Sequence, residues 1–365
     1  MRIICTVTND LTYDQRMHRI CTSLSKAGYE VELVGRMLQN SAPLQNKTFK
    51  QTRLKNQFNK KVFFYAEHNI RLFFYLLKAD YDVVCSIDLD TLLSGYTASK
   101  FRKKRLVYDA HEYFTELEEV VQRPVVRFIW KQLANFLIPK IKTGYTVSKG
   151  YAGLFKKNFN ADLKVVRNAT IYQKRELPVE REYILYQGAV NVGRGLETLI
   201  EAMQMVDYPL VICGKGDVFD SLQNQVKQLN LSHKVKFIGY VSPSDLVEFT
   251  AKAKIGITLF TNAGLSNQYS LANRFFDYMH HGVPQLAMDY PEYRKFNQSY
   301  EVAHLIKQVD KKEIASALNQ LLQDDTHWNR LHHNAFLAAQ ENNWQQDEAI
   351  LLKVYEDLAA NLHNQ

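Results

Sequence analysis

The stretch Tyr183-Ile-Leu-Tyr-Gln-Gly-Ala-Val-Asn-Val-Gly-Arg-Gly195 opens as a run of apolar residues and ends in a glycine-rich turn. The apolar run predicts a buried strand over residues 183–188, and the apolar spacing that follows predicts a helix over 195–205. A strand, a glycine turn and a helix in this order make up half of a βαβ unit, in which successive strands are parallel. The stretch therefore predicts an α/β domain whose first strand begins at residue 183.

Strand-like runs rich in Val and Ile alternate with amphipathic helical patterns along the rest of the chain, for example a helix over 14–27. Many of these runs carry apolar residues consecutively, as strands do in a parallel sheet that helices cover on both faces. The predicted fold class is α/β, with two Rossmann-like, doubly wound parallel-sheet domains that face each other across a cleft. The predicted strands cover residues 2–8, 29–35, 82–87, 105–108, 143–147, 163–166, 183–188, 208–213, 234–238, 254–259 and 284–287.

This alternation lapses over residues 168–182, which are polar and contain a proline. A chain of 365 residues exceeds the usual size of one domain, and a stretch of this composition is a natural linker. We expect an N-terminal domain over 1–172, a C-terminal domain over 173–345, and a terminal helix over 346–365 that packs back toward the first domain. Ligands of such sheets bind at the carboxyl ends of the strands, so both domains are expected to line the cleft.

The chain carries a formal net charge of +8, and its basic excess lies in the N-terminal half. No nucleic-acid-binding signature accompanies this charge, which suits a protein that handles anionic ligands or works at an anionic membrane face. No stretch approaches the roughly 18–20 uncharged residues that cross a bilayer. The four cysteines fit no zinc or redox spacing and are expected to be buried, reduced thiols. These features predict a cytoplasmic protein, either soluble or peripheral at the inner face of the membrane.

The turn from Gly188 to Gly195 is the first candidate binding element. Glycines let the backbone approach a ligand closely, and the start of the following helix offers unpaired N–H groups to an anion. Arg194 adds a guanidinium whose geometry suits a phosphate, although an ordinary βα turn with a surface arginine is an equal alternative. A second such turn, Cys213-Gly-Lys-Gly-Asp217, contributes Gly214. Neither turn has the G-x-G-x-x-G spacing of a dinucleotide site.

The segment Gly264-Leu-Ser-Asn-Gln-Tyr-Ser-Leu-Ala-Asn-Arg-Phe-Phe-Asp-Tyr-Met-His-His-Gly-Val-Pro284 predicts a polar loop followed by a helix from about residue 271. The backbone N–H groups of Ser270 and Leu271 are placed to bind a phosphate at the helix start, and Arg274 reaches the same anion one turn later. Asp277 lies about two turns beyond Ser270 on the same face, where a carboxylate accepts hydrogen bonds from a ribose diol. Phosphate followed by ribose is the footprint of a nucleoside diphosphate. The alternative is a helix with one exposed ion pair between Arg274 and Asp277.

Polar side chains follow two predicted strands of the N-terminal domain and are expected at the cleft. Asp109-Ala-His-Glu112 follows the strand at 105–108, and His111 is an imidazole between carboxylates that can move a proton or orient a hydroxyl. A structural histidine held in a tight loop is the alternative. The loop after the first strand carries four polar residues that either contact a polar acceptor or cap and decorate the helix over 14–27. These residues are Asn9, Asp10, Asp14 and Arg16.

Two further patterns have both a structural and a functional interpretation. Asp88-Leu-Asp90 has the spacing of a metal-binding D-x-D, but Asp90 is better placed as the N-cap of the following helix, so no metal site is predicted. Aromatic and basic residues interleave over 58–78 and over 127–142. These stretches either dock on anionic lipid or a lipid-linked acceptor, or form core helices with solvated Lys and Arg side chains.

Several of these segments occur together in an order that is typical of one family. They are Asn9-Asp10, Asp14-Gln-Arg16, Asp109-Ala-His-Glu112, Tyr145-Thr-Val-Ser148, Val166-Arg-Asn168, Gly188 with Gly193-Arg-Gly195, and Ser266-Asn267 with Ser270-Leu-Ala-Asn-Arg-Phe-Phe-Asp277. In this order the chain resembles the retaining, GT-B-fold glycosyltransferases of family 4, the glycosyl transferases group 1. The resemblance extends over residues 1–345 and is most specific over 270–284.

The resemblance implies a hexosyl or glycosyltransferase that needs neither a metal nor a cofactor, with an N-terminal acceptor-side domain and a C-terminal donor domain. His111 and Arg194 are the implied catalytic residues: His111 faces the donor sugar near the reacting carbon, and Arg194 holds the diphosphate that departs. The implied donor-binding residues are Gly193, Arg194, Gly214, Ser270, Leu271, Arg274 and Asp277. The implied acceptor-side residues are Asn9, Asp10, Asp14, Arg16 and Glu112.

The chain departs from the family pattern at three positions of the donor domain. Tyr269 stands where the family usually has an acidic residue that contacts the donor sugar. The ribose acid, commonly Glu, is here Asp277, which is shorter by one methylene group. Ala189 stands where an arginine often follows the first glycine, so Arg274 is expected to carry more of the phosphate charge.

The function predicted is transfer of a sugar from a nucleoside diphosphate sugar to a glycan or lipid-linked acceptor in cell-surface polysaccharide or glycolipid synthesis. A UDP-sugar is favoured because such donors are common. The nucleotide sugar is a co-substrate, nucleic acid is not an expected partner, and peripheral contact with an anionic membrane is. The alternatives are a nucleotide-sugar epimerase of the same fold and a non-catalytic binding protein with a decayed donor site, which Tyr269 keeps open.

Overall fold

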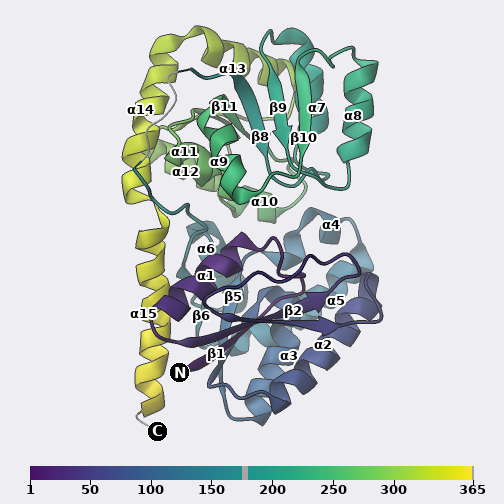
Figure 1. The fold of residues 1–365 in the computed structure, drawn as a ribbon, viewed down its shortest axis with the longest axis vertical. Helices are drawn as coiled ribbons and strands as arrows, with labels where there is room; N and C mark the ends of the chain where they lie inside the picture. Colours follow the sequence, from purple (N-terminus) through teal and green to yellow (C-terminus); the bar gives the residue numbers. More distant parts are fainter. Residues whose placement is uncertain (175–179, 364–365) are drawn as a thin grey trace. The chain divides into compact units, whose positions relative to one another are not determined.

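The computed structural model describes residues 1–174 and 180–363. The chain divides into two compact units: unit 1 contains Met1–Arg167 and Asp347–Gln365, and unit 2 contains Asn168–Gln346. Each unit is built on one parallel sheet (Figure 1). Residues 175–179 of the predicted linker and residues 364–365 of the predicted terminal helix lie outside the described residues. The predicted domain boundary, between residues 172 and 173, lies after the observed division between 167 and 168. Asn168 and Thr170 belong to unit 2 because their side chains form hydrogen bonds with Asn273 and Asp277 of that unit.

The sheet of unit 1 has seven parallel strands in the order β3-β2-β1-β4-β5-β6-β7. Cys5 of β1 pairs with Leu33 of β2 on one side and with Cys85 of β4 on the other. The chain therefore runs outward from β1 to β3, crosses back to β4, and continues outward to β7. The strands are β1 (Arg2–Thr6), β2 (Glu30–Met37), β3 (Lys50–Lys55), β4 (Val83–Ile87), β5 (Arg105–Ala110), β6 (Gly144–Thr146) and β7 (Lys164–Val165).

Helices cover the sheet of unit 1. Because parallel connections are right-handed, α2, α3 and α5 lie on one face of the sheet and α1 lies on the other. The helices are α1 (Gln15–Lys26), α2 (Lys61–Lys78), α3 (Asp88–Phe101), η1 (Phe114–Glu116), α4 (Glu118–Val121), α5 (Pro124–Leu137), η2 (Ile138–Lys140), α6 (Lys149–Phe159) and α15 (Trp344–His363). The first three residues of α15 belong to unit 2, and the helix belongs to unit 1 from Asp347 onward.

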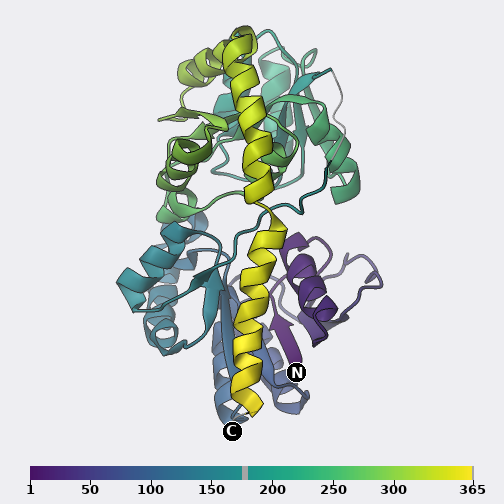
Figure 2. The same cartoon turned by 90° about the vertical axis from the view of Figure 1, so that its left-hand side faces the viewer.

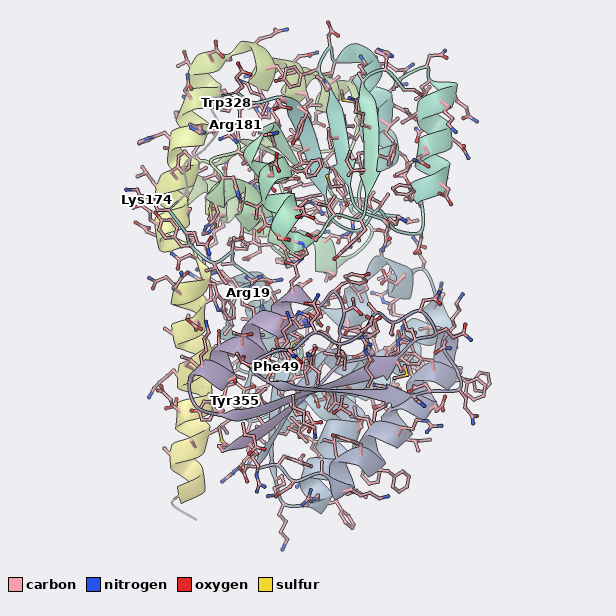
Figure 3. All side chains as sticks on the ribbon, viewed as in Figure 1. Arg19, Phe49, Lys174, Arg181, Trp328 and Tyr355 are labelled. Atoms are coloured by element: carbon pink, nitrogen blue, oxygen red, sulfur yellow. The ribbon has the colours of Figure 1, made fainter. Side chains whose placement is uncertain are left out.

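The terminal helix α15 contacts unit 1 through polar groups at two positions, Asp347 at the start of its unit 1 portion and Tyr355 near the middle. Asp347 accepts a hydrogen bond from the backbone N–H of Arg167 at 2.9 Å and pairs with the guanidinium of Arg167. Further along, Tyr355 is fully buried, and its hydroxyl lies 3.5 Å from that of Tyr145 (Figure 3). Figure 2 shows the unit 1 portion of α15 running lengthwise along that unit. The helix thus completes the core of the first unit although it is the last element of the chain.

The sheet of unit 2 has six parallel strands in the order β10-β9-β8-β11-β12-β13. The strands are β8 (Tyr183–Gln187), β9 (Leu210–Cys213), β10 (Val235–Gly239), β11 (Ala253–Thr258), β12 (Gln285–Met288) and β13 (Ala303–Ile306). The helices are α7 (Leu196–Ala202), η3 (Met203–Met205), α8 (Phe219–Gln228), α9 (Pro243–Ala251), α10 (Leu265–Tyr269), α11 (Asn273–His280), α12 (Pro291–Tyr300), α13 (Lys311–Gln323) and α14 (Asp325–Glu341).

Strand β8 shows why its apolar run predicts a strand covered on both faces. Ile184 and Tyr186 pack into the large hydrophobic core of unit 2, whereas Tyr183 and Leu185 pack into a second cluster on the opposite face. Burying a large apolar side chain stabilises a fold by roughly 1.5–3 kcal/mol, so both faces contribute. The predicted strand and the predicted pair of doubly wound parallel sheets are confirmed.

Two strands and one helix start differ from the sequence-based predictions. The edge strand β3 was not predicted because Lys50–Lys55 has no apolar run, and β13 was not predicted because Ala303–Ile306 is short. The helix predicted from about residue 271 is present as α11, and it begins two residues later, at Asn273, with Ala272 as its N-cap residue. The predicted polar loop before it instead contains the short helix α10. The four cysteines are buried and free, as predicted.

Candidate functional site

The strand order of unit 2 reverses direction beside β8, which lies between β9 and β11. The chain leaves β8 toward β9 and β10 and then returns to β11 on the other side. Ligands of open parallel sheets bind at the carboxyl ends of the strands where the order reverses. The segments that follow β8, β9 and β11 therefore form the candidate binding region of unit 2, and they contain the predicted donor residues.

Two arginines from different segments meet at one aromatic ring in this region. The guanidinium carbon of Arg194 lies 4.9 Å from the centroid of the Phe260 ring, and that of Arg274 lies 4.5 Å from the same centroid. Arg274 is 8% exposed, contacts the Tyr186 ring at 4.8 Å, and donates a hydrogen bond to the carbonyl of Leu259 at 3.1 Å. The two residues predicted to hold a phosphate are thus brought together.

Within residues 1–174 and 180–363, neither guanidinium forms an ion pair with a carboxylate within 4.0 Å. Nε of the buried Arg274 has no hydrogen-bond partner in the same part of the chain. The two positive charges also lower the pKa of the Tyr293 phenol, although burial raises it to about 12 overall. An anion bound beside Phe260 would relieve the repulsion between the two guanidinium groups.

The glycine turns after β8 and β9 pack directly on each other. Gly214 has φ +151°, and a Cβ at this position would lie 1.8 Å from the carbonyl oxygen of Gly188. Gly188 has φ +127°, and a Cβ there would lie 3.5 Å from Nη1 of Arg274. Gly193 accepts a hydrogen bond from the backbone N–H of Thr261, which joins the first turn to the segment after β11. The glycines therefore allow three backbone segments to meet beside Arg274.

Asp277 lies on α11 with both carboxylate oxygens hydrogen-bonded within unit 2. Oδ1 accepts a hydrogen bond from the hydroxyl of Thr170 at 2.6 Å, and Oδ2 accepts one from the amide of Gln187 at 3.0 Å. These partners fix the orientation of the carboxylate. A carboxylate held in this way is the kind of group that accepts hydrogen bonds from a ribose diol in other nucleotide sites.

Ser270 and Leu271 lie before the helix and not at its first turn. Ser270 follows α10, and its hydroxyl donates to the carbonyl of Asn267 at 3.5 Å. Leu271 is buried in the hydrophobic core. Ala272 is the N-cap residue of α11, and its N–H donates to the hydroxyl of Tyr293. The helix entrance is therefore shifted toward Arg274, and Ser270 and Leu271 belong to the connection between two helices.

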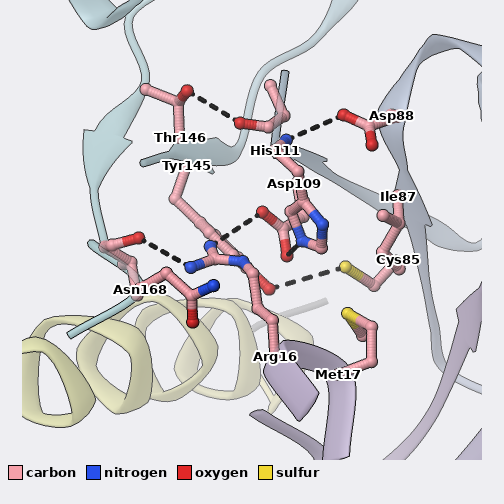
Figure 4. A network of polar contacts seen from close by, with 12 residues as sticks. Arg16, Met17, Cys85, Ile87, Asp88, Asp109, His111, Tyr145, Thr146 and Asn168 are labelled. Carbon is pink, nitrogen blue, oxygen red and sulfur yellow. Dashed lines mark hydrogen bonds and ion pairs between the residues drawn. The ribbon is translucent and has the colours of Figure 1, made fainter. Parts of the chain in front are cut away.

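In unit 1, the segment after β5 forms a buried ionic network around Asp109 (Figure 4). Asp109 is fully buried, and its carboxylate lies 2.8 Å from Nε2 of His111 and 3.2 Å from Nη2 of Arg16. Burial alone would raise the pKa of Asp109, but the charges of Arg16 and His111 outweigh it and hold that pKa below its ordinary value. The predicted imidazole is thus oriented by an ionised carboxylate.

Asp88 fixes the backbone of the same segment. Its Oδ1 accepts hydrogen bonds from the N–H groups of His111 at 2.8 Å and Glu112 at 3.0 Å. Burial, followed by the nearby charges of Glu112 and Asp90, raises the pKa of Asp88 well above its ordinary value. Asp88 also adopts φ +54°, which is strained for a residue with a Cβ. Strained residues of this kind are typical of functional positions. The two hydrogen bonds of Asp88 hold the loop that carries His111.

The predicted acceptor-side residues of the first loop are largely engaged in the loop itself. Asp14 caps α1 by accepting from the N–H of Met17, and Asn9 donates its amide to the carboxylate of Asp14. Asp10 accepts from the backbone N–H and the hydroxyl of Thr12. Arg16 is buried beside Asp109 and donates to the carbonyl of Val166. The capping interpretation of Asp14 is confirmed, and Arg16 is a buried partner of Asp109.

The prediction that Asp90 is the N-cap of α3 was wrong, because the helix begins at Asp88 and its N-cap residue is Ile87. Asp90 instead accepts a hydrogen bond from the hydroxyl of Thr8 at 2.6 Å, and burial raises its pKa to about 6. Within residues 1–174 and 180–363, no group of three or more His, Cys, Asp or Glu side chains is arranged to hold a metal ion.

Sequence reasoning missed several residues that build the site. Phe260 and Tyr186 provide the rings on which Arg274 lies, and Thr170 and Gln187 hold the carboxylate of Asp277. A positional signal was available for most of them. Tyr186 and Gln187 end β8, and Phe260 follows β11 by two residues, so all three lie at the carboxyl edge of the sheet.

Comparison with known proteins gives a family match for most of unit 2. Residues 168–337, which fall within unit 2, match the family model described as glycosyl transferases group 1. The predicted resemblance to the glycosyl transferases group 1 is confirmed over these residues. None of the helices in the described ranges combines the length and the apolarity that crossing a bilayer requires.

Curated relatives match only part of the chain. An uncharacterized glycosyltransferase of Methanocaldococcus jannaschii is 28% identical over 29% of this chain and 28% of its own length. A phosphatidyl-myo-inositol mannosyltransferase of Mycobacterium leprae is 26% identical over 48% of this chain and 46% of its own length. The matched regions thus span less than half of these relatives.

Solved structures match over nearly the whole chain. Sucrose-phosphate synthase from Thermosynechococcus elongatus superposes with a TM-score of 0.82 at 16% identity, covering 99% of this chain and 100% of that one. Anabaena Alr3699/HepE in complex with UDP and glucose gives 0.73 at 15% identity, with complete coverage of both chains. WaaG, a glycosyltransferase involved in lipopolysaccharide biosynthesis, gives 0.68 at 15% identity, covering 96% of this chain and 99% of that one. At these identities the likeness shows the fold, which is GT-B.

Proposed function

We propose that this chain, which carries a glycosyl transferases group 1 domain and has the GT-B fold, is a retaining glycosyltransferase. It moves a sugar from a nucleoside diphosphate sugar to a hydroxyl group of a glycan or a lipid-linked acceptor. The observation that carries the proposal is the pair of guanidinium groups of Arg194 and Arg274 on the Phe260 ring. The pair lies at the carboxyl edge of the unit 2 sheet, where such sheets bind their ligands.

A diphosphate is the ligand that fits this pair. Two guanidinium groups that share a ring and have no carboxylate partner in the described part of the chain repel each other in a medium of low polarity. A diphosphate offers oxygens to both groups and accepts paired N–H donors in the planar geometry that arginine provides. Asp277 follows Arg274 by three residues on α11, so the ribose of the same ligand is proposed to bind its carboxylate.

The proposed reaction breaks the bond between the anomeric carbon of the donor sugar and the diphosphate oxygen. The oxygen of the acceptor hydroxyl forms a bond to the same carbon on the same face, and its proton passes to the departing diphosphate. Negative charge grows on the departing group, and Arg194 and Arg274 stabilise this charge by fixed, preorganised electrostatics. We propose that the step needs no metal ion or cofactor, because these two cations take the place of one.

His111 is proposed to meet the donor sugar through its ring. Nε2 of His111 is held by Asp109, so Nδ1 is the ring atom that remains for a substrate hydroxyl. The backbone contacts of Asp88 to His111 and Glu112 keep the loop in position. Glu112 is exposed and is proposed, with Asn9 and Asp10, to lie on the acceptor side.

The donor nucleotide and the acceptor class are supported by the similar proteins. One similar structure holds UDP and glucose, which supports a UDP-sugar as donor. The mycobacterial relative is named for a phosphatidyl-myo-inositol acceptor, and WaaG is described as acting in lipopolysaccharide biosynthesis. These names support synthesis of a cell-surface polysaccharide or glycolipid. A lipid-linked acceptor is embedded in a membrane, so this acceptor class requires contact with a membrane surface.

The experiment that tests the proposal is a thermal-shift panel of UDP-, GDP- and ADP-sugars, followed by incubation with the radiolabelled form of the best ligand. A ligand that binds the native state raises the melting temperature. We expect a UDP-sugar to raise it and the label to appear in an acceptor. Label that changes sugar identity without transfer would show an epimerase instead. No melting shift with any nucleotide sugar would show a decayed donor site, as the tyrosine at position 269 allows.

A further inference from the structure

Unit 2 contains a polar cavity at the edge of its sheet opposite the proposed donor site. The cavity has a volume of about 490 Å³, and three of its lining residues lie where strands begin. Arg181 precedes β8 by two residues, Tyr208 precedes β9 by two residues, and Lys254 is the second residue of β11. These strands are neighbours in the sheet, so their amino ends form one edge. The length of the strands, roughly 15 Å, separates this amino-edge cavity from the carboxyl edge.

Two cations from different strands line the amino-edge cavity. The guanidinium of Arg181 donates to the carbonyls of Ala253 at 3.3 Å and His281 at 3.0 Å, and burial lowers its pKa to about 10. The ammonium of Lys254 lies 4.0 Å from the centroid of the Trp328 ring. The indole is fixed in turn, because its Nε1 donates to the carbonyl of Lys254 at 2.9 Å. Arg181 and Trp328 lie on the same side of unit 2 (Figure 3).

The charges of these two cations are compensated only in part. Within residues 1–174 and 180–363, neither Arg181 nor Lys254 forms an ion pair with a carboxylate within 4.0 Å. Burial lowers the pKa of Lys254, the charge of Asp325 opposes this change, and the charge of Arg181 adds to it. One carboxylate, that of the exposed Asp207, lines the cavity. An anion bound beside both cations would therefore relieve their repulsion.

The rest of the cavity wall suits hydroxyl groups. Asn319 and Gln323 of α13 contribute amides, and Asp207 contributes its carboxylate. The oxygens of amides and carboxylates accept hydrogen bonds from hydroxyl groups. A lone phosphate would leave most of a 490 Å³ cavity empty, whereas cavities of about 300–1,000 Å³ hold whole small molecules. The cavity thus offers cations for an anionic head and acceptors for a hydroxylated body.

The aromatic side chains of the cavity are occupied by contacts within unit 2. Trp328 is 8% exposed, because Lys254 lies over its ring and the ring of His332 stacks on it with the centroids 4.8 Å apart. The hydroxyl of Tyr208 donates to the carbonyl of Arg181 at 2.8 Å. A base normally stacks on an open aromatic face. The cavity therefore fits a hydroxylated molecule better than a nucleotide.

From these observations we infer that the amino-edge cavity binds a small phosphorylated polyol. A phosphate monoester carries about 1.5–2 negative charges at pH 7, which matches the two cations Arg181 and Lys254. Arginine provides paired N–H donors to phosphate oxygens, and lysine provides a point charge. The hydroxyl groups of the ligand bind Asp207, Asn319 and Gln323. The inference uses no residue of the proposed donor site and assigns a ligand that is neither the donor nor its diphosphate product.

The experiment is titration calorimetry of the protein with sorbitol 6-phosphate, sorbitol and inorganic phosphate. Sorbitol 6-phosphate has no anomeric carbon and therefore cannot act as a glycosyl donor. UDP is present throughout, so that the proposed donor site is occupied. We expect sorbitol 6-phosphate to bind, and sorbitol and inorganic phosphate to bind at least about tenfold more weakly. Lys254→Gln removes one cation and Gln323→Glu adds a carboxylate, and each should raise the Kd of sorbitol 6-phosphate at least about tenfold.

Gln228→Glu is the matched control, because Gln228 is exposed on α8 of unit 2 and does not line the cavity. It should bind sorbitol 6-phosphate like the original protein, and so should Arg194→Ala, which tests the same point without UDP. Gln323 is exposed as well, so Gln323→Glu should keep the original melting temperature even if Lys254→Gln is less stable.

The inference is overturned if sorbitol 6-phosphate does not bind, or if Gln323→Glu binds it as tightly as Gln228→Glu does. Binding that is lost in Arg194→Ala and kept in Gln323→Glu would place the ligand in the donor site and overturn it too. Inorganic phosphate that binds as tightly as sorbitol 6-phosphate would contradict the assignment of a polyol.

Discussion

Oδ2 of Asp109 lies 2.8 Å from Nε2 of His111, inside a network that holds the carboxylate completely away from solvent. The opposite oxygen of Asp109 meets the guanidinium of Arg16. One carboxylate thus both orients the imidazole and neutralises a buried cation. This dual role makes Asp109 a positioning residue for His111 and a structural residue for unit 1, and the two roles can be separated by experiment.

Asp109→Asn should lower turnover while sparing nucleoside diphosphate affinity. The amide keeps the size of the carboxylate but loses the charge that stabilises one orientation of His111, and we expect kcat to fall by at least about tenfold. Leaving Arg16 buried without its partner should cost about 3–5 kcal/mol of unfolding free energy. Steady-state kinetics and urea unfolding measure the two effects. Asp80→Asn is the control, since Asp80 is exposed and pairs only at the surface with Arg2. If kcat fell equally in Asp109→Asn and Asp80→Asn, Asp109 would have no role in the mechanism.

Arg194→Ala and Arg274→Ala should both weaken binding of UDP, but with different effects on stability. Each substitution removes one charge-assisted contact worth roughly 1.5–3 kcal/mol, which corresponds to at least a tenfold rise in Kd. Arg274 is buried between two rings, so its loss should also lower the melting temperature, whereas Arg194 is only half-buried. Calorimetry with UDP checks the affinities. Arg330→Ala on α14, where the side chain is 52% exposed, should leave UDP affinity unchanged. If Arg330→Ala weakens UDP binding as much as Arg194→Ala and Arg274→Ala do, the assignment of the two arginines to the phosphate site is wrong.

Asp277→Ala should discriminate between the two parts of the donor nucleotide. The proposed contact of Asp277 is with the ribose, so UDP affinity should fall about tenfold while affinity for inorganic pyrophosphate stays the same. Thr170 and Gln187 lose their acceptor in this variant, which should lower the melting temperature as well. Asp277→Asn keeps an acceptor oxygen and should lose less stability. A parallel loss of UDP and pyrophosphate binding would place Asp277 at the phosphates and not at the ribose.

The sequence allowed the sheets to be predicted because their strands are apolar on both faces. The first four residues of Tyr183–Gln187 are apolar or aromatic, so neither face of the strand is polar. Such a run is typical of a buried parallel strand. The edge strand Lys50–Lys55 is polar because only one of its neighbours is a strand, and the pattern therefore gave no signal. The start of α11 was misplaced for another reason. The hydroxyl of Tyr293, distant in sequence, binds the N–H of Ala272, and no local pattern reports such a contact.

The candidate site was predictable in part, because strand ends show which loops gather at one edge of a sheet. Arg194 was predicted from the turn after a strand, and Arg274 and Asp277 were predicted from their spacing along one helix. The structure brings Arg194 and Arg274 to one ring and places Asp277 beside Gln187 at the end of β8. Their partners were not predicted: Phe260 is an ordinary core residue in sequence, and only the fold brings both arginines to its ring. The opposite error occurred at Arg16. This residue was expected on the acceptor side, but its side chain is buried against Asp109. The direction in which a side chain points depends on tertiary packing, and the spacing of residues in the sequence does not determine it.

The pH dependence of stability should reveal two buried groups in unit 1 with opposite signs. Burial lowers the pKa of His68 to about 4, so between pH 6.5 and 4 the unfolded chain takes up a proton that the folded chain refuses, and folding is weakened as pH falls. Burial raises the pKa of Asp90 to about 6, so between pH 6 and 3.8 the folded chain takes up a proton first, and folding is strengthened as pH falls. Each effect is worth about 3 kcal/mol.

These two contributions nearly cancel in the original protein, so single variants should separate them. His68→Gln should become more stable relative to the original protein as pH falls from 6 to 4, and Asp90→Asn should become less stable over the same range. Urea unfolding at several pH values gives the difference in unfolding free energy. Other acids titrate in this range, but they are common to all three proteins and drop out of the difference. Curves that stay parallel to that of the original protein would contradict both assignments.

Gly214→Ala tests whether the packing of the two glycine turns builds the donor site. A Cβ at this position would lie 1.8 Å from the carbonyl of Gly188, and φ of +151° is unfavourable for alanine, so one turn must move away from the other. We expect UDP affinity to fall at least about tenfold, because Gly188 faces Arg274 and moves with its turn. The melting temperature should fall too.

Gly153→Ala provides the matched substitution. Gly153 lies in α6 with open space around its Cα, so alanine should raise the unfolding free energy by roughly 0.5–1 kcal/mol and leave UDP affinity unchanged. The contrast separates a general effect of glycine replacement from the close approach of the two turns. If Gly214→Ala bound UDP as tightly as Gly153→Ala, the turns would not need to touch for the nucleotide to bind, and the phosphate site would have to depend on the arginines alone.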